Sequence, residues 1–254
     1  MNKGAVPPKL STYSASNPNA DWDQFRNSPS RYLQVQRTLY TDQKGLCAYC
    51  EIDLQIGLGQ QSDFRVEHFH SKSPHAPPPN HALDWSNLLG CCHGGSSRNV
   101  ADPARFTAPD LSCDAVKEDS DWVGVILDPI RDIPAFPRLF EFKESSGAMA
   151  PDQAFCPSHL LTQAQASIDN LHLTSNVSGQ PNRLDRFRKA VMEKLREEME
   201  KRIDGGMEFA DAATELAGIF LPNSAAKWPA FFTCIRWYLG PAAEDRLRVI
   251  HFNG

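Results

Sequence analysis

Apolar side chains recur every three or four residues in several stretches of the chain, which predicts amphipathic helices. The clearest run covers residues 182–204, where Asn182 can cap the first turn and Gly205 and Gly206 end the helix. Its apolar positions are Leu184, Phe187, Val191, Leu195, Met199 and Ile203. Shorter runs predict a brief helix from residue 22 and helices over residues 30–43, 112–119, 209–220 and 225–238.

Alternating patterns and turn residues predict the remaining elements. Alternation of apolar and polar residues predicts a strand over residues 64–69 and a hairpin over residues 138–149. The prolines of residues 74–79 exclude regular structure there, and residues 1–20, rich in Pro, Ser and Asn, form either an extended arm or a loose tail. We expect an α+β, mostly helical fold with an N-terminal arm and helix (residues 1–45), a core (46–125) and a hairpin with a helical C-terminal region (126–254).

Composition narrows the class of protein. The chain has 254 residues, 41% of them hydrophobic, which is enough for one or two buried cores. No stretch approaches the roughly 20 apolar residues of a membrane span, and residues 1–27 contain no apolar signal-peptide segment, so we expect a cytoplasmic protein. The formal net charge of −5 argues against coating of nucleic acid by bulk attraction and leaves room for a local basic cleft.

The seven cysteines are an odd number, and in a reducing compartment they favour metal ligands or buried thiols over disulfides. Cys47 and Cys50 have the two-residue gap of half a tetrahedral thiolate site. The other half has to come from Cys91 or Cys92 and from Cys113. The predicted structural zinc site therefore comprises Cys47, Cys50, Cys92 and Cys113, and the alternative is a set of buried structural cysteines. Cys156 and Cys234 have no partner at ligand spacing and are expected in the core.

Glu67 and His68 lie side by side on the predicted strand, so their side chains point to opposite faces and cannot both bind one ion. One can hold a metal while the other works beside it. Phosphodiester hydrolysis needs such a pair, because neutral imidazole can deprotonate water and a divalent cation can stabilise the phosphate. Glu67 and Asp114 offer the hard oxygen ligands that Mg²⁺ or Mn²⁺ prefers.

Four short motifs in this order resemble the zinc-bearing form of the HNH endonucleases. They are Cys47-x-x-Cys50-Glu51, Glu67-His68-Phe69-x-x-Lys72-Ser73, Asn87-Leu88-x-x-x-Cys92 and Cys113-Asp114-x-x-Lys117. The resemblance implies a ββα-metal fold, in which two strands and a helix hold one catalytic metal and a zinc knuckle joins the ends. Departures from the usual pattern are Ser71 in place of Pro, Glu67 in place of Asp, and Asp114 in place of Asn or His.

Carried over residue by residue, the resemblance assigns His68 as general base and Glu67 and Asp114 as carboxylate ligands of the catalytic cation. Asn87 corresponds to the residue that orients the base, and the less favoured alternative is that it merely caps a turn. Three further side chains are candidate phosphate contacts, namely Lys72, Lys117 and His70, and Lys117 could instead steady its helix. His93 is a rival of Asp114 for the last ligand of the motif, but it follows Cys92 directly.

The resemblance extends to a narrower group, the HNH proteins encoded with an ATPase in Septu-type antiphage systems and in certain retron operons. The segments that show this resemblance include Pro7-Pro8-x-Leu10, Ile168-Asp169-Asn170-Leu171-His172-Leu173 and Leu184-x-x-x-Arg188. It implies cleavage of DNA, or of RNA, beside an ABC/OLD-like ATPase subunit. Two other readings remain open at this point: a non-catalytic zinc module that docks nucleic acid or protein, and a standalone restriction-like nuclease.

Overall fold

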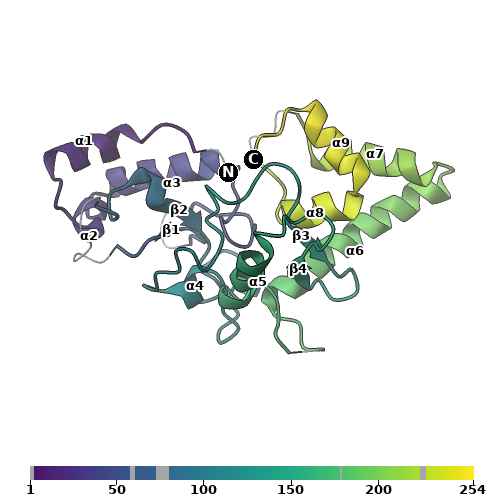
Figure 1. Cartoon of the computed structure of the whole chain (residues 1–254), viewed down its shortest axis with the longest axis horizontal. Helices are drawn as coiled ribbons and strands as arrows, with labels where there is room; N and C mark the ends of the chain where they lie inside the picture. Colours follow the sequence, from purple (N-terminus) through teal and green to yellow (C-terminus); the bar gives the residue numbers. More distant parts are fainter. Residues whose placement is uncertain (1–2, 58–60, 73–79, 178, 224–226) are drawn as a thin grey trace.

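The computed structural model describes residues 3–57, 61–72, 80–177, 179–223 and 227–254. Helices at the two ends of the chain form the two ends of the molecule, and two small sheets lie between them (Figure 1). The N-terminal group contains α1 (Pro8–Ser16), α2 (Trp22–Arg26) and α3 (Pro29–Asp42). The C-terminal group contains α6 (Arg183–Asp204), α7 (Phe209–Phe220), α8 (Phe232–Leu239) and α9 (Pro241–Val249). Among the described residues the fold is mostly helical with small sheets, as expected for an α+β protein.

The central part of the chain contains the strands. β1 (Arg65–His68) pairs antiparallel with β2 (Leu88–Cys91), and the register places Glu67 opposite Leu89 and His68 opposite Leu88. β3 (Phe140–Phe142) and β4 (Met149–Pro151) form the second antiparallel pair. Short helical pieces complete this part, namely η1 (Trp85–Asn87), η2 (Pro103–Arg105), α4 (Asp114–Lys117) and α5 (Leu161–Asn170).

Several sequence-based expectations need correction. Residues 8–16 form α1, whose Leu10 is fully buried, so this segment is neither an extended arm nor a loose tail. The helix expected over residues 112–119 shrinks to α4, because Cys113 and Glu118 on its two sides have positive φ angles. α8 begins at Phe232, and residues 225–226 of the helix expected there lie outside the described residues, as do His75 and the proline-rich residues 74–79. The sequence patterns did not predict α5 or α9.

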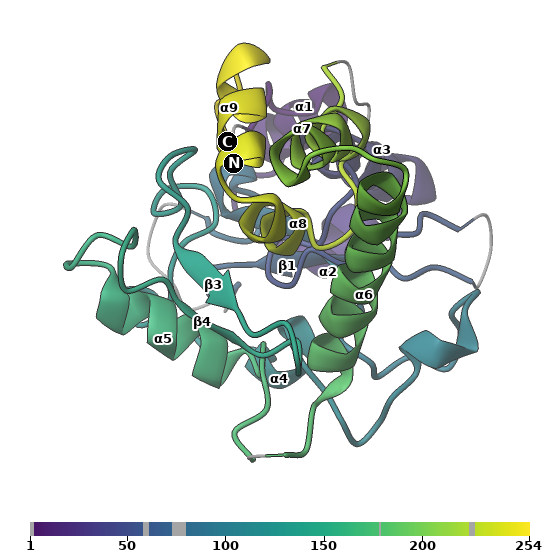
Figure 2. The ribbon, with the colours of Figure 1, turned by 90° about the vertical axis from the view of Figure 1, so that its right-hand side faces the viewer.

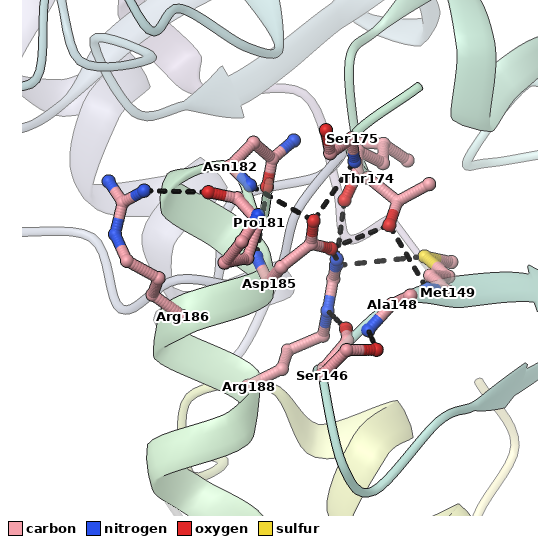
Figure 3. Close-up of polar contacts among 12 residues, drawn as sticks. Ser146, Ala148, Met149, Thr174, Ser175, Pro181, Asn182, Asp185, Arg186 and Arg188 are labelled. Carbon is pink, nitrogen blue, oxygen red and sulfur yellow. Dashed lines mark hydrogen bonds and ion pairs between the residues drawn. The ribbon is translucent and has the colours of Figure 1, made fainter. Parts of the chain in front are cut away.

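Helix α6 is fixed at its N-terminal end by a buried ion pair. Asp185 accepts hydrogen bonds from Thr174, Ser175 and the Asn182 backbone, and Arg188 donates to Asp185 at 2.9 Å and to the carbonyl oxygen of Gly147 at 2.8 Å (Figure 3). These contacts join the first turns of α6 to the β3–β4 hairpin. α8 contacts both β3 and α6, so the hairpin, α8 and α6 pack against one another (Figure 2).

The C-terminal helices dock directly on the Cys47–Cys50 segment. Glu51 has a φ angle of 61° and accepts hydrogen bonds from the backbone N–H and the hydroxyl group of Thr233, in the first turn of α8. The backbone N–H of Phe231 also donates to the carbonyl oxygen of Glu51 at 2.8 Å. A carboxylate at a helix N-terminus satisfies N–H groups that the helix itself leaves unpaired. Within the described residues, no helix combines the length and the apolar character needed to cross a lipid bilayer.

Candidate metal centre and catalytic cleft

Four cysteine sulfurs from three separate segments meet in the interior. The Sγ atoms of Cys47, Cys50, Cys92 and Cys113 all lie within 4.8 Å of one another, and all four residues are buried. Cys50 Sγ and Cys92 Sγ are 3.7 Å apart. Sulfurs bound to one tetrahedral Zn²⁺ at about 2.3 Å would be separated by about 3.8 Å, whereas a disulfide would need about 2.05 Å. The spacing therefore fits zinc and does not fit a disulfide.

Backbone N–H groups near the sulfurs point at them and can donate hydrogen bonds to them. The N–H of Cys92 points at Cys47 Sγ at 3.4 Å, and the N–H of Gly94 points at Cys92 Sγ at 3.4 Å. A positive φ of 58° at Cys113 turns the chain into α4, so that Cys113 faces the sulfurs and Asp114 faces β1. Of the neighbouring thiols that sequence analysis left open, Cys92 belongs to this set of four and Cys91 does not.

Glu67 and Asp114 lie together in a cleft of about 410 Å³ beside the cysteine centre. Lys117 Nζ contacts Glu67 Oε1 at 2.8 Å, Tyr49 Oη donates to the same oxygen at 3.3 Å, and Arg65 Nη1 contacts Asp114 Oδ2 at 2.6 Å. Burial, and next the adjacent Asp114 carboxylate, raise the pKa of Glu67 to about 8, against the opposing effect of Lys117. Repulsion between the two ionised carboxylates is one cause of the raised pKa of Glu67, and a divalent cation bound to their hard oxygen atoms would relieve it.

His68 lies in the same cleft with its ring held from two sides. Its Nε2 is 3.1 Å from the carbonyl oxygen of Ala82, and the edge of the ring meets Trp22 at 4.9 Å between centroids. Because a carbonyl oxygen only accepts, Nε2 must carry the hydrogen, which leaves the lone pair of the neutral ring on Nδ1. Burial, as the largest cause, lowers the pKa of His68 to about 3. The imidazole is therefore neutral at pH 7, and so low a pKa makes the buried ring a weak base.

Asn87 closes the loop that follows β1. Its side-chain oxygen accepts from the backbone N–H of His70 at 2.7 Å, and its amide nitrogen donates to the carbonyl oxygens of His70 at 3.0 Å and His81 at 2.8 Å. The amide thus does not contact the ring of His68. Its effect on that ring is indirect, since it holds the residue next to Ala82.

The Asn87→Ala variant is expected to lose about 1–3 kcal/mol of unfolding free energy, because it leaves buried backbone groups at both ends of the loop unpaired. Urea unfolding measures this loss, with the exposed Asn99→Ala as the matched control. A stability equal to that of the unaltered protein would show that the loop does not depend on this amide.

The remaining candidate site residues differ in where they lie relative to the cleft. Lys72 is exposed and lines the cleft, where it is placed to meet a phosphate. The Lys117 side chain is 1% exposed, and its ammonium group contacts Glu67 and the carbonyl oxygen of His68, so it joins α4 to β1. His70 stacks on His81 at 4.6 Å and is not among the described lining residues of the cleft. His93 lines the cleft, but its Nδ1 faces Arg65, not Glu67.

Sequence reasoning missed four contributors to these sites. Arg65 shares a strand face with Glu67, two residues away, so strand periodicity was a usable signal for it. Tyr49 is inside the cysteine motif but carries no signal of its contact with Glu67. Trp22 and Arg183 reach the site from α2 and α6, far away in the sequence, so no local pattern could have found them.

Comparison with known proteins gives one match. The chain is 38% identical over 168 residues to "Retron Ec83 putative HNH endonuclease" of Escherichia coli. The matched region covers 61% of this chain and 63% of that protein, which is less than two thirds of its length. No family model and no solved structure matches the chain. The similarity supports the predicted relationship with HNH endonucleases.

Proposed function

We propose that the protein is a metal-dependent HNH endonuclease. The observation that carries the proposal is the arrangement in the cleft: His68, with its Nε2 held by the carbonyl oxygen of Ala82, shares the cleft with the carboxyl groups of Glu67 and Asp114. In this proposal β1, β2 and α4 form the ββα-metal core, and the four cysteines hold a structural Zn²⁺ that joins the start of the core to α4. The identity with the retron Ec83 protein supports this proposal.

Each residue of the cleft has a distinct part in the proposed reaction. A Mg²⁺ or Mn²⁺ ion held by Glu67 and Asp114 would stabilise charge on the phosphate and on the leaving 3′ oxygen. His68 Nδ1 takes a proton from the attacking water, while the carbonyl oxygen of Ala82 keeps the ring in the required tautomer. Lys117 and Arg65 hold the two carboxylates in place, and Lys72 meets the substrate backbone. Hydrolysis of this kind gives 5′-phosphate and 3′-hydroxyl ends.

The charge of the cleft bears on how the substrate is held. Its described lining contains four cations and four acids: Arg26, Arg65, Lys72 and Lys117 against Glu67, Asp114, Glu118 and Asp119. The cleft therefore lacks the excess of positive charge that attracts a polyanion by itself. With a net charge of −5, the chain is suited to a role as the nuclease subunit of a defence system that obtains substrate affinity from a partner, here an ABC/OLD-like ATPase. DNA is the proposed substrate.

The test is cleavage of plasmid DNA and of labelled RNA by the purified chain with Mg²⁺ or Mn²⁺, with and without an ABC/OLD-like ATPase of the proposed kind. Cleavage that a chelator abolishes supports the nuclease, and cleavage only with the ATPase supports the two-subunit arrangement. Cleavage by the chain alone supports the standalone enzyme. No cleavage in any mixture, with zinc retained, would favour the non-catalytic zinc module.

Asp114→Ala and His93→Ala form a matched pair for the catalytic metal ligand. Loss of Asp114 is expected to reduce the cleavage rate by about 10²–10³-fold, because the cation loses one of its two charged ligands. His93→Ala is expected to reduce it far less, because the His93 ring contacts Arg65. The reverse order of effects would assign the last ligand of the motif to His93.

A further inference from the structure

Arg183, the first residue of α6, is a buried cation without a carboxylate partner. Its side chain is fully buried, and Nη1 donates to Ser112 Oγ at 2.8 Å. Its Nε and Nη2 atoms are buried and, among the described residues, have no hydrogen-bond partner of good geometry. A guanidinium group removed from water without an anion costs several kcal/mol. Some anionic group must therefore compensate for it.

The cysteine centre supplies that anion. Ser112, which binds the guanidinium group, directly precedes Cys113. Burial acts to lower the pKa of Arg183, and the nearby sulfur groups of Cys92, Cys50 and Cys113 together raise it above its ordinary value. Four thiolates and one Zn²⁺ have a net negative charge. In a buried site this charge and a nearby cation stabilise each other.

The other described buried arginines show that Arg183 is a special case. Arg188, one turn along α6, is paired with Asp185 and two backbone carbonyl oxygens (Figure 3). Arg236 is paired with Glu244, and Arg105 with Asp63. Of the arginines less than a tenth exposed in the described part of the chain, Arg183 alone faces sulfur in place of a carboxylate.

We propose that Arg183 is the charge-compensating residue of the four-cysteine zinc centre and that it couples zinc retention to the docking of α6. The inference rests on the proposed zinc, not on the proposed nuclease activity. The centre is tied to α5 as well, because the N–H of Cys113 donates to the carbonyl oxygen of Leu171, just after α5, at 2.8 Å. Coupling of this kind is reciprocal: loss of Arg183 weakens zinc binding, and loss of zinc weakens the docking of α6.

The experiment compares zinc retention in the full-length chain and three variants, Arg183→Met, Arg183→Lys and Arg188→Met. Zinc content is measured by elemental analysis, and zinc release by transfer to a chromogenic chelator well below the melting temperature. Arg183→Met is expected to release zinc about 10–100-fold faster, the usual effect of removing a group that supports metal ligands. Arg183→Lys keeps the positive charge, and its rate of zinc release is expected to lie between those of Arg183→Met and the unaltered chain. Arg188→Met removes a buried pair from the same helix and is expected to lower the melting temperature without a comparable change in release.

A second measurement covers the case in which Arg183→Met folds poorly. Removal of zinc is expected to lower the melting temperature of Arg183→Lys by less than it lowers that of the unaltered chain. For Arg188→Met, removal of zinc is expected to lower the melting temperature as much as it does for the unaltered chain. Equal release from Arg183→Met and the unaltered chain, or equally fast release from Arg188→Met, would overturn the inference. An unaltered chain without zinc would overturn both the inference and the zinc centre, whereas the cleavage assay would still decide the nuclease.

Discussion

The His68→Ala variant is expected to cleave nucleic acid about 10²–10⁴-fold more slowly than the unaltered chain, the range typical of losing a general base. The imidazole ring is the described group of the cleft that is both neutral at pH 7 and fixed in one tautomer by the carbonyl oxygen of Ala82. Zinc content is expected to stay unchanged, because the ring does not contact the cysteine centre. Single-turnover cleavage at saturating Mg²⁺ or Mn²⁺ measures the effect.

Two controls separate loss of a base from loss of structure. His159→Ala removes an exposed histidine outside the cleft and is expected to leave the rate unchanged. Added imidazole is expected to restore part of the activity of His68→Ala, because a small base can enter the space left by the ring. An unaffected cleavage rate in His68→Ala would exclude this residue as the base and direct attention to the other groups of the cleft.

The sequence predicts the chemistry of the site better than the fold around it. Short motifs hold the reacting groups: the Cys47–Cys50 gap, the Glu67-His68 pair and Cys113-Asp114 are local, and the structure brings all of them to one place. α6 was predictable for a similar reason, since its apolar period runs through six turns. These features depend on neighbours in the sequence, so a pattern can report them.

Features that depend on distant contacts escaped prediction. α1 lacks a clear apolar period, and its place is set by Leu10 packing into the main core. α4 is short because the chain turns at Cys113, whose sulfur joins the cysteine centre, and again at Glu118, where it leaves the cleft. Helix propensity along the sequence does not predict these two turns. The hydrogen bond from Arg183 to Ser112 joins residues 71 positions apart in the sequence. Such contacts follow from the finished packing and leave no local trace.

Loss of a cysteine ligand is expected to have the largest effect on stability. Cys113→Ala should abolish zinc binding and lower the melting temperature steeply, because structural zinc contributes on the order of 10 kcal/mol of folding free energy. Three separate segments meet at the sulfurs, and Arg183 of α6 binds Ser112 beside Cys113, so the centre lies where the central part of the chain meets the C-terminal helices. Elemental analysis and thermal unfolding, with and without a zinc chelator, measure the loss.

The neighbouring thiols provide the matched comparison. Cys92→Ala is expected to behave like Cys113→Ala, whereas Cys91→Ala, equally buried, is expected to keep zinc and lose only the stability of a small core truncation. Cys156→Ala, at a buried position outside the centre, should also keep zinc. If all four variants kept zinc, or if none of them ever bound it, the four sulfurs would be ordinary core side chains. Arg183 would then lack an anionic partner among the described residues, and its burial would cost several kcal/mol.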